Sequence, residues 1–467
     1  MKHINAHGIK WHLKDSALVE FVKGFSHEEG RKRSHFVFEH NGRKIFIKFF
    51  KEKGLYGLVR NRVSPRGKKE FCLSGKLISL SIPTPEPLGY GISDTGSYVI
   101  HEWIDGSTFV DVYEAGDTGI VLLLKLADFL NELKQRHIRH NDLHLNNIIH
   151  KDGSLYLVDL HKMQIKNVFS LGDEISNLAH AITMVYHDMT EEEKDAFFQR
   201  YGDKDIRVPL EAELKRLRHR WIRKKMERAF NDTSTMTTDG NYVYIAGFEA
   251  YGKGGLLSVI KEDKKVKIER YNDHLRKTYR NKRRLDRAWK NHIALKYLNI
   301  RITPQAFFVK KPSFAEKGFI AMEDLAGKGE ELDRYLDRRY DRLSAHERRT
   351  FIYKLSAFFV YAIKQWVIHR DMKACNIFVS EDDNFIFLDV EDIVFREMDE
   401  ETLKRMLIQL NTTIPKKIPA GDRIRFFLKL SAPLKMKNKS LFRKIIAESL
   451  SSKIVYEGVS GLRIEDW

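Results

Sequence analysis

The sequence predicts an α+β fold of two tandem units, each with a small β-rich N-lobe and a mainly helical C-lobe. The first observation behind this prediction is a repeated motif, His-x-Asp with an Asn five residues after the Asp. It occurs as HNDLHLNNII from His140 and as HRDMKACNIF from His369, so the two aspartates are 371 − 142 = 229 residues apart. The second observation is that the segments flanking the motif also occur twice and in the same order. Such self-similarity indicates a duplicated unit.

Length and composition agree with two globular units. The 467 residues exceed what one hydrophobic core usually organises, and 42% of them are hydrophobic while 31% are charged. The net charge of +18 indicates an anionic partner without separating nucleic acid from phospholipid or nucleotide. The two cysteines, Cys72 and Cys375, are too few for a disulfide framework, and no apolar stretch has the length of a membrane span. We expect a cytoplasmic protein without a disulfide partner, which could still lie on a membrane surface.

In the first unit, the segment SHFVFEHNGRKIFIKFF predicts two strands joined by an Asn41-Gly42 turn, with Lys48 inside the second strand. The segment KKEFCLSGKLI that follows is typical of a helix and carries Glu70. A Pro-containing connection, IPTPEPLGYG, then leads to an apolar strand that ends at Glu102. These elements make up the predicted N-lobe.

The second unit shows the same order of elements. The segment LLSVIKEDKKVKIERY predicts a hairpin that carries Lys267, and the apolar strand GFIAME ends near Glu323. The helix glutamate is the exception. A shift of 267 − 48 = 219 residues places Trp289 where the first unit has Glu70, and Asp286 is the nearby substitute. The second unit therefore lacks an evident partner for its lysine.

Both C-lobes begin with a helical segment before the His-x-Asp motif. In the first unit the helix is expected over residues 118–134, and in the second it starts at Ser344, with Glu347 completing a capping box. After the motif, the apolar runs LYLVD and FIFLD close on Asp159 and Asp389.

The boundary between the units is expected at the polar cluster NDTSTMTT, and LKRLRHRWIRKKMER before it predicts a basic helix. The predicted domains are residues 1–234, with an N-lobe to about 101 and a C-lobe from about 102, and residues 235–467, with an N-lobe to about 322 and a C-lobe from about 323.

A strand lysine, a helix glutamate, a His-x-Asp loop with its Asn and a later Asp are the groups that hold Mg-ATP and deliver its terminal phosphoryl group to a hydroxyl. The lysine would neutralise phosphates, the later Asp and the Asn would carry Mg²⁺, and the loop Asp would accept the hydroxyl proton. The candidate residues are Asp142 and Asp371 for catalysis, Asn147, Asp159, Asn376 and Asp389 for the metal, and Lys48, Glu70, Lys267, Lys373, Glu102 and Glu323 for the nucleotide. A phosphate-covering loop is only weakly marked, by GFSHEEG at 24–30 and GKGG at 252–255.

The chain resembles the bacterial lipopolysaccharide core kinases, which phosphorylate Kdo or heptose sugars, within the protein-kinase-like superfamily. The resemblance is carried by VDLHKMQ at 158–164, LDVEDI at 388–393 and PRGKKEFCLSGKLISLSIPTPEPLGYG from Pro65. It implies ATP, Mg²⁺, a sugar hydroxyl of a lipid-linked glycan as acceptor, and action at the cytoplasmic face of the inner membrane. It also implies that Lys373 supports the transferring phosphate, where the first unit has His144. No conventional activation segment follows Asp159 or Asp389, which disfavours a protein acceptor.

The basic segments Lys215–Arg228 and His274–Arg287 fit an anionic membrane surface, although a solvated linker helix explains the first equally well. Three alternatives stay open. The HND-L-H-x-x-N pattern also resembles antibiotic and choline phosphotransferases, so the protein could be a small-molecule or Ser/Thr protein kinase. The missing helix glutamate allows a pseudokinase scaffold whose second unit is non-catalytic. A nucleic-acid-binding module rests on net charge alone, and we expect no nucleic-acid partner.

Overall fold

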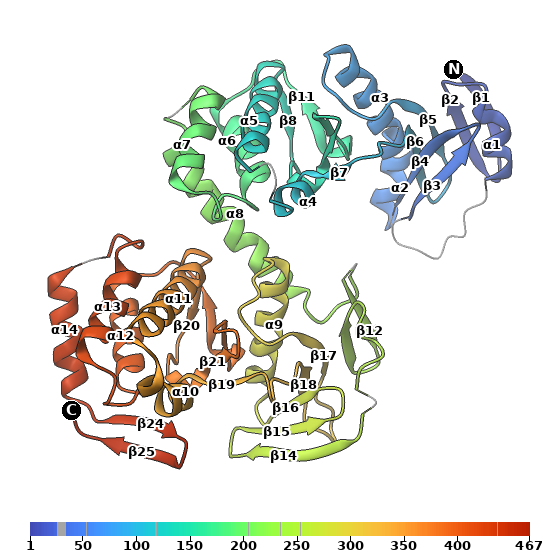
Figure 1. Ribbon diagram of the computed structural model, residues 1–467. Coiled ribbons are helices and arrows are strands. Elements are labelled where there is room, and N and C mark those ends of the chain that lie inside the picture. Colours follow the sequence, from blue (N-terminus) through green and yellow to red (C-terminus); the bar gives the residue numbers. More distant parts are fainter. Residues whose placement is uncertain are drawn as a thin grey trace. The chain divides into compact units, whose positions relative to one another are not determined.

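The computed structural model describes residues 1–25, 34–52, 54–116, 119–203, 205–233, 235–252, 254–436 and 438–467. The chain divides into two compact units, Met1–Arg218 and His219–Trp467. The predicted α+β fold is confirmed: each unit has a sheet-rich N-lobe followed by a mainly helical C-lobe (Figure 1). The division falls inside helix α8 (Arg207–Glu227), ahead of the polar cluster at 231–238, in which Ser234 lies outside the described residues.

The N-lobe of unit 1 is a six-stranded antiparallel sheet in the order β1-β2-β5-β6-β4-β3. The predicted hairpin is present, and its turn residues Asn41 (φ 51°) and Gly42 (φ 74°) both have the left-handed backbone that a two-residue turn requires. Trp11, Phe49 and Tyr98 lie in the core on one side of the sheet. The elements are β1 Lys2–Ala6, β2 Ile9–Leu13, α1 Leu18–Gly24, β3 Ser34–His40, β4 Arg43–Lys51, α2 Gly54–Val63, α3 Arg66–Ser79, β5 Pro87–Ile92 and β6 Gly96–Glu102.

Helix α3 approaches the sheet closely because its second residue is Gly67. A Cβ atom at this position would lie 2.2 Å from the carbonyl oxygen of Tyr98, so only glycine fits. The Gly67 amide also donates a 3.0 Å hydrogen bond to Ser97 Oγ. This contact fixes the start of the helix against β6 and carries Glu70, less than one turn later, toward β4.

The C-lobe of unit 1 is built around helix α5, whose buried leucines belong to its large core. The helix expected over residues 118–134 is observed from Gly119 to Gln135, while Thr118 lies outside the described residues. The C-lobe elements are β7 Ser107–Thr108, α4 Phe109–Glu114, α5 Gly119–Gln135, β8 Ile138–His140, η1 Leu145–Asn147, β9 Ile148–Lys151, β10 Ser154–Leu157, η2 Leu160–Lys162, β11 Met163–Ile165, α6 Leu171–Ile182, α7 Glu191–Tyr201 and α8.

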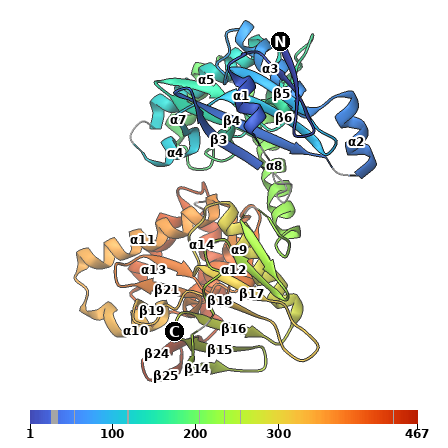
Figure 2. The ribbon, with the colours of Figure 1, turned by 90° about the vertical axis from the view of Figure 1, so that its right-hand side faces the viewer.

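The N-lobe of unit 2 repeats this sheet and adds an edge strand, in the order β12-β13-β17-β18-β16-β15-β14. The predicted hairpin is present as β14 and β15, but a third strand, β16, follows it and pairs with the central strand β18. Figure 2 shows β14, β15 and β16 side by side. The elements are β12 Met236–Asp239, β13 Tyr242–Ile245, β14 Leu256–Glu262, β15 Val266–Tyr271, β16 Leu275–Tyr279, α9 Lys282–Tyr297, β17 Ala306–Lys310 and β18 Phe319–Met322.

The C-lobe of unit 2 is organised by the long helix α11, which packs along α13 (Figure 2). The predicted capping box is confirmed, because Glu347 N donates to Ser344 Oγ and Ser344 N donates to Glu347 Oε2. The elements are β19 Gly329–Glu331, α10 Leu332–Arg339, η3 Tyr340–Arg342, α11 Ala345–Lys364, β20 Val367–His369, η4 Ala374–Asn376, β21 Ile377–Ser380, β22 Phe385–Phe387, η5 Val390–Asp392, β23 Ile393–Phe395, α12 Glu400–Asn411, α13 Ala420–Ser431, α14 Lys439–Leu450, β24 Ile454–Gly458 and β25 Gly461–Glu465.

Within the described part of the chain, no helix combines the length and the apolar character that crossing a bilayer requires. Cys72 and Cys375 are both free thiols.

Candidate active site

Lys48 lies at the centre of the site in unit 1. It is in β4, opposite Val99 of β6. Its Nζ lies 3.1 Å from Glu70 Oε2 and 2.5 Å from Asp159 Oδ1. A strand, a helix and a loop that are distant in the sequence therefore meet at one ammonium group.

Glu70 is the buried partner of Lys48, and its side chain is only 4% exposed. Burial alone would raise the pKa of Glu70, but Lys48 and His101 outweigh it and hold the pKa below the ordinary value. Glu70 is therefore ionised at neutral pH. The ion pair expected between the strand lysine and the helix glutamate is present.

Asp159 and Asp389 close the corresponding strands in the two units with the same unusual backbone. Asp159 has φ 59° and ψ 51°, and Asp389 has φ 48° and ψ 54°, both in the left-handed region. A non-glycine residue in this region costs about 1 kcal/mol or more, and such residues cluster at functional sites. In each unit the imidazole of the motif histidine contacts a backbone carbonyl oxygen at this turn. His140 Nε2 lies 3.2 Å from the Asp159 carbonyl oxygen, and His369 Nε2 lies 2.9 Å from the Leu388 carbonyl oxygen.

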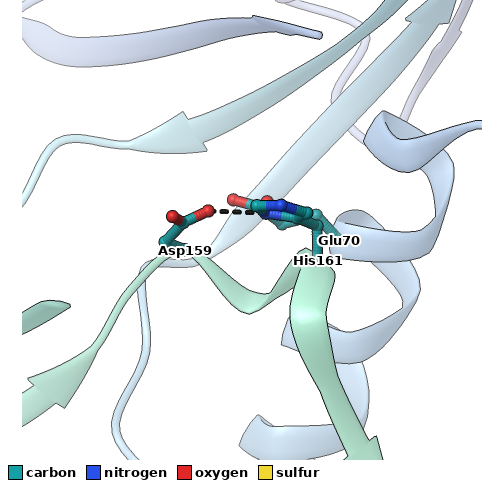
Figure 3. A group of neighbouring side chains, drawn as sticks. All are labelled: Glu70, Asp159 and His161. Atoms are coloured by element: carbon teal, nitrogen blue, oxygen red, sulfur yellow. Dashed lines mark hydrogen bonds and ion pairs between the residues drawn. The ribbon is translucent and has the colours of Figure 1, made fainter. Parts of the chain in front are cut away.

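Glu70, Asp159 and His161 form a compact cluster of groups that can bind a metal ion, with ligand atoms within 4.8 Å of one another (Figure 3). His161 Nδ1 lies 2.6 Å from Asp159 Oδ1. Lys48 contacts both carboxylates of this cluster, and Glu70, its buried partner, is already engaged by that ammonium. We therefore assign no metal to these three residues as a set.

The loop of the His-x-Asp motif in unit 1 is held by short backbone hydrogen bonds. His144 N donates to Asp142 O (2.9 Å), Asn147 N donates to His144 O (2.7 Å), and Val158 N donates to Asn147 O (2.9 Å). The Asn147 side chain adds a 2.9 Å bond from Nδ2 to the Asp142 carbonyl oxygen. This bond leaves Asn147 Oδ1 without a hydrogen bond in the described part of the chain. Amide and carboxylate oxygens are ligands that Mg²⁺ prefers, and the bond from Val158 N to the Asn147 carbonyl oxygen joins Asn147 to the residue before Asp159, so Asn147 and Asp159 fit a magnesium site.

Helix α6 anchors the start of the loop. Asn177 Nδ2 donates to the Ile138 carbonyl oxygen at 2.7 Å, and its Oδ1 accepts from His140 N at 3.0 Å. Burial lowers the pKa of His140 to about 4, against the opposing effect of Asp159, so the ring is neutral at pH 7.

Asp142 is paired with Lys162, which comes from the turn just after Asp159. Burial alone would raise the pKa of Asp142, but the hydrogen bond and charge of Lys162 lower it overall. The carboxylate is therefore ionised at neutral pH and is able to accept a proton. No motif in the sequence singles out Lys162.

The loop of unit 2 repeats the same bonds. Lys373 N donates to Asp371 O (2.9 Å), Asn376 N donates to Lys373 O (3.0 Å), and Leu388 N donates to Asn376 O (2.8 Å). Asn376 Nδ2 donates to the Asp371 carbonyl oxygen at 2.7 Å. The duplicated motif therefore folds into the same loop twice.

The strand lysine of unit 2 is Lys277 and not Lys267. Lys267 is in β15 and pairs with Glu269 at 2.8 Å, so the structure does not bring it to Asp389. Lys277 is in β16, the strand that pairs with β18 as β4 pairs with β6, and its Nζ lies 2.6 Å from Asp389 Oδ1. The assignment to Lys267 failed because the hairpin β14-β15 is one strand further from the sheet centre than the hairpin β3-β4.

The carboxylate partner of Lys277 is also in an unexpected place. Glu391, two residues after Asp389, contacts Lys277 Nζ at 3.0 Å and is fully buried. Asp286, the substitute suggested by the sequence, has no contact with Lys277 in the described residues. The basic run from His274 to Arg287, expected on a surface, directs Lys277, Arg284 and Arg287 toward the Glu391 turn.

The lysine that contacts the motif aspartate comes from a different sequence position in each unit. In unit 2, Lys373 contacts Asp371 at 3.0 Å. Unit 1 has His144 at that place, and its lysine is Lys162, which contacts Asp142. Each motif aspartate therefore has a lysine partner.

Glu102 is the last residue of β6, and Glu323 directly follows the equivalent strand β18, where the N-lobe sheet leads into the C-lobe. Glu102 N donates to Glu86 O at 2.9 Å, and Glu323 N donates to Gln305 O at 2.8 Å. The side chain of Glu323 pairs with Lys328. Neither carboxylate contacts the lysine clusters in the part of the chain that the structure describes. The candidate phosphate loops at 24–30 and 252–255 include residues 26–30 and 253, which lie outside the described residues.

One signal in the sequence could have located Lys277. It precedes Asp371 by 371 − 277 = 94 residues, and Lys48 precedes Asp142 by 142 − 48 = 94 residues. The offset of 219 that selected Lys267 disagrees with the 229-residue spacing of the motifs. Glu391 and Lys162 have no such signal, because their roles depend on which side chains meet in space.

No family model and no curated protein matches the sequence. One solved structure that resembles part of the chain is titled "WaaP in complex with acyl carrier protein". Its identity with this chain is 17%, its TM-score is 0.33, and the match covers 43% of this chain and 89% of that chain. A likeness of this size carries no argument about activity, which has to be argued from the residues of the site.

Proposed function

We propose that unit 1 is an ATP-dependent phosphotransferase that phosphorylates an alcohol, namely a sugar hydroxyl, Kdo or heptose, of the lipopolysaccharide inner core. The observation that carries the proposal is the position of Lys48 between Glu70 and Asp159, next to a loop that presents an ionised Asp142 with its own lysine. This is the set of charges that phosphoryl transfer needs.

The donor would bind through groups that are already in place. Lys48, oriented by Glu70, would neutralise the α- and β-phosphates of the nucleotide, and the base would lie at the end of β6, beside Glu102. Asp159 and Asn147 would hold Mg²⁺, which supplies positive charge to the phosphate oxygens when it is bound. Asp159 keeps its charge for this purpose, because His161 and Lys48 outweigh burial and hold its pKa well below the ordinary value.

The transfer step uses Asp142 and Lys162. The acceptor oxygen forms a bond to the γ-phosphorus while the bond from that phosphorus to the bridging oxygen breaks, and ADP leaves with the bonding electrons. The hydroxyl proton passes to the Asp142 carboxylate. Lys162, beside Asp142, stabilises the negative charge on the moving phosphoryl oxygens.

The short segment after Asp159 supports a small or glycan acceptor over a peptide. Helix α6 starts at Leu171, only 171 − 159 = 12 residues after Asp159, and β11 occupies part of this span by pairing with β8. A folded peptide-binding segment has little room there. The basic helix α8, with exposed Arg216, Arg220 and Arg223, fits an acceptor that is anchored in an anionic membrane surface.

The experiment is transfer of the labelled γ-phosphate of ATP, with Mg²⁺, to purified inner-core lipopolysaccharide. We expect labelled sugar with the wild-type chain and at least a 100-fold lower rate with Asp142→Asn, because loss of a general base costs 10²–10⁴-fold. Asp128→Asn is the matched control, since Asp128 is an exposed aspartate that pairs with Arg200, and it should leave the rate unchanged.

Other acceptors give distinct outcomes. Transfer to a free aminoglycoside or to peptide hydroxyls, without transfer to lipopolysaccharide, would replace the proposed acceptor by a small-molecule or protein acceptor. Nucleotide binding without any turnover, unchanged in Asp142→Asn, would show a scaffold and contradict the proposal.

A further inference from the structure

The buried cluster around Glu391 has no counterpart at the same sequence positions in unit 1. In unit 1 the carboxylate that orients the strand lysine comes from helix α3, as Glu70, and the residue two after Asp159 is His161. In unit 2 the residue two after Asp389 is Glu391, and it supplies the carboxylate.

The helix position that Glu70 holds is filled by alanine in unit 2. Helices α3 and α9 both end just before a left-handed residue, Ser81 and Asn299. Glu70 precedes Ser81 by 81 − 70 = 11 residues, and Ala288 precedes Asn299 by 299 − 288 = 11 residues. Ala288 is fully buried. The carboxylate is therefore not lost from unit 2 but moved from the helix to the loop.

Glu391 is held from several sides at once. Its carboxylate accepts from Lys277 Nζ, from Arg284 Nε at 3.0 Å and from the Tyr279 hydroxyl at 3.2 Å. Its carbonyl oxygen accepts from Arg287 Nε at 2.6 Å. These donors come from β16 and from the first two turns of α9, so the turn after Asp389 is fastened to both elements.

A side chain of helix α9 also bonds the backbone of the same turn. Asn291 Nδ2 donates to the carbonyl oxygens of Val390 and Ile393, at 2.8 and 2.9 Å. Arg284, Ala288 and Asn291 are three to four residues apart and therefore lie on one face of the helix. The face that would carry a helix glutamate is the face that contacts Glu391.

Lys277 is buried between two carboxylates. Its Nζ lies 3.0 Å from Glu391 Oε1 and 2.6 Å from Asp389 Oδ1. The side chain is 7% exposed, while the Asp389 carboxylate beside it is 38% exposed. A charged lysine next to an accessible aspartate, above a loop with Asp371 and Asn376, is suited to a phosphate chain and a divalent cation.

The hairpin next to β16 adds free positive charge. Ile268 of β15 is opposite Lys277, and the turn with Lys264 and Lys265 lies three residues further along the strand, about 10 Å away. Both lysines are exposed and have no ion pair in the described part of the chain. These two lysines add to the positive charge of the hairpin that borders β16.

From this arrangement we infer that unit 2 contains a second binding site for a Mg²⁺-nucleoside triphosphate, in which Glu391 is the residue that positions Lys277. The site is complete within unit 2. It requires no helix glutamate, because the turn after Asp389 supplies the carboxylate. The inference concerns binding in unit 2 and goes beyond the transfer proposed for unit 1.

The test counts nucleotides bound to the full-length chain by isothermal titration with ADP and Mg²⁺. We expect two ADP molecules per wild-type chain and one per chain when unit 1 is disabled by Lys48→Met with Asp159→Asn. In that disabled background, Lys277→Met should abolish binding, whereas Lys267→Met, the matched control one strand away, should leave the affinity within twofold. A disabled chain that binds no nucleotide, or one that responds to Lys267→Met instead, overturns the inference.

The role of Glu391 is tested by moving its carboxylate. In the same background, Glu391→Gln should weaken ADP binding at least tenfold, and Ala288→Glu added to Glu391→Gln should restore the affinity to within about threefold. Failure to restore it, with unit 2 still folded in a thermal melt, contradicts the positioning role.

If Glu391→Gln unfolds unit 2, Asp389→Asn decides the matter, since Asp389 is partly exposed and asparagine tolerates its left-handed backbone. Loss of binding in Asp389→Asn supports the site, and unchanged binding overturns it. Two bound nucleotides without any phosphoryl transfer would contradict the proposed function and leave this inference standing.

Discussion

At the scale of single residues, the site depends on lysines held between carboxylates. Lys48 contacts Glu70 and Asp159, and Lys277 contacts Glu391 and Asp389. Each ammonium is held by two carboxylates that come from different elements. In the proposed sites it would meet a phosphate without further ordering, which is the usual benefit of a preorganised site.

Glu70→Gln should weaken nucleotide binding in unit 1 about 10- to 100-fold, because a hydrogen bond to a charged group contributes about 1.5–3 kcal/mol. Titration with ADP and Mg²⁺ in a chain carrying Lys277→Met, so that only unit 1 is observed, measures the effect. Glu86→Gln is the control, since Glu86 pairs with Lys14 at the surface. Equal affinity of wild type and Glu70→Gln would show that Asp159 alone positions Lys48.

Lys162→Met should change the pH profile as well as the rate. Lys162 lowers the pKa of Asp142, so its removal raises that pKa and moves the acid limb of the kcat profile to higher pH. The fall in activity at pH 6 should therefore be larger than the fall at pH 8. Lys125→Met, which removes a lysine that bonds only the Gly153 carbonyl oxygen, should leave the profile in place. If the acid limb of the profile does not shift in Lys162→Met, Lys162 does not lower the pKa of Asp142.

At the scale of elements, the sequence predicted those features that depend on interactions between residues close together in the chain. The Asn41-Gly42 turn, the capping box of α11 and the loops after both motifs formed as expected, because each depends on residues that are close in the sequence. The strand that carries the second lysine could not be chosen in this way. Whether β15 or β16 lies next to β18 is decided by pairing across more than forty residues, and both strands carry a lysine.

In the candidate site, too, some residues could be predicted from the sequence and others could not. Lys48, Glu70 and the loop residues were predictable because their types and order match a known chemistry. Glu391 was not, because it lies 114 residues from Lys277 in the sequence, and only the packing of α9 on the turn after Asp389 brings the two together. Lys162 was missed for the same reason: its partner Asp142 is 20 residues away.

Ser344→Ala should lower the free energy of unfolding of unit 2 by about 1 kcal/mol, because it removes the side-chain oxygen that accepts from Glu347 N at the start of α11. Urea unfolding followed by circular dichroism measures the change. Ser344→Thr keeps the oxygen and should cost clearly less. If both variants have the same free energy of unfolding as the wild type, the capping box does not contribute to stability.

At the scale of the whole molecule, buried histidines make stability depend on pH. Burial lowers the pKa of His140 in unit 1 to about 4 and that of His292 in unit 2 to about 3, against an ordinary value of 6.5. The folded chain therefore prefers both rings neutral. Their contribution to stability is fully present above pH 6.5 and is lost as the pH falls toward 4 and 3, because the unfolded chain then binds the extra protons.

When the pH falls from 7.5 to 5, each of these histidines should lower the free energy of unfolding by about 2 kcal/mol, because the loss is about 1.4 kcal/mol per pH unit below 6.5. His292→Leu should remove this part of the pH dependence from unit 2, and His346→Leu, at an exposed position of α11, should not. Urea unfolding at the two pH values gives the comparison. The same loss of stability in wild type and His292→Leu would show that the ring is protonated in the folded chain.

The carboxylate that moves from helix α3 in unit 1 to the turn after Asp389 in unit 2 has a consequence for recognising related chains. A search pattern that requires glutamate at one fixed place on the helix after the strand lysine keeps Glu70 and discards unit 2, where Ala288 stands. A pattern that accepts the acid either on that helix or two residues after the strand-closing aspartate keeps both units. The second pattern can be used to search again among units that lack the helix glutamate and were therefore classed as degenerate.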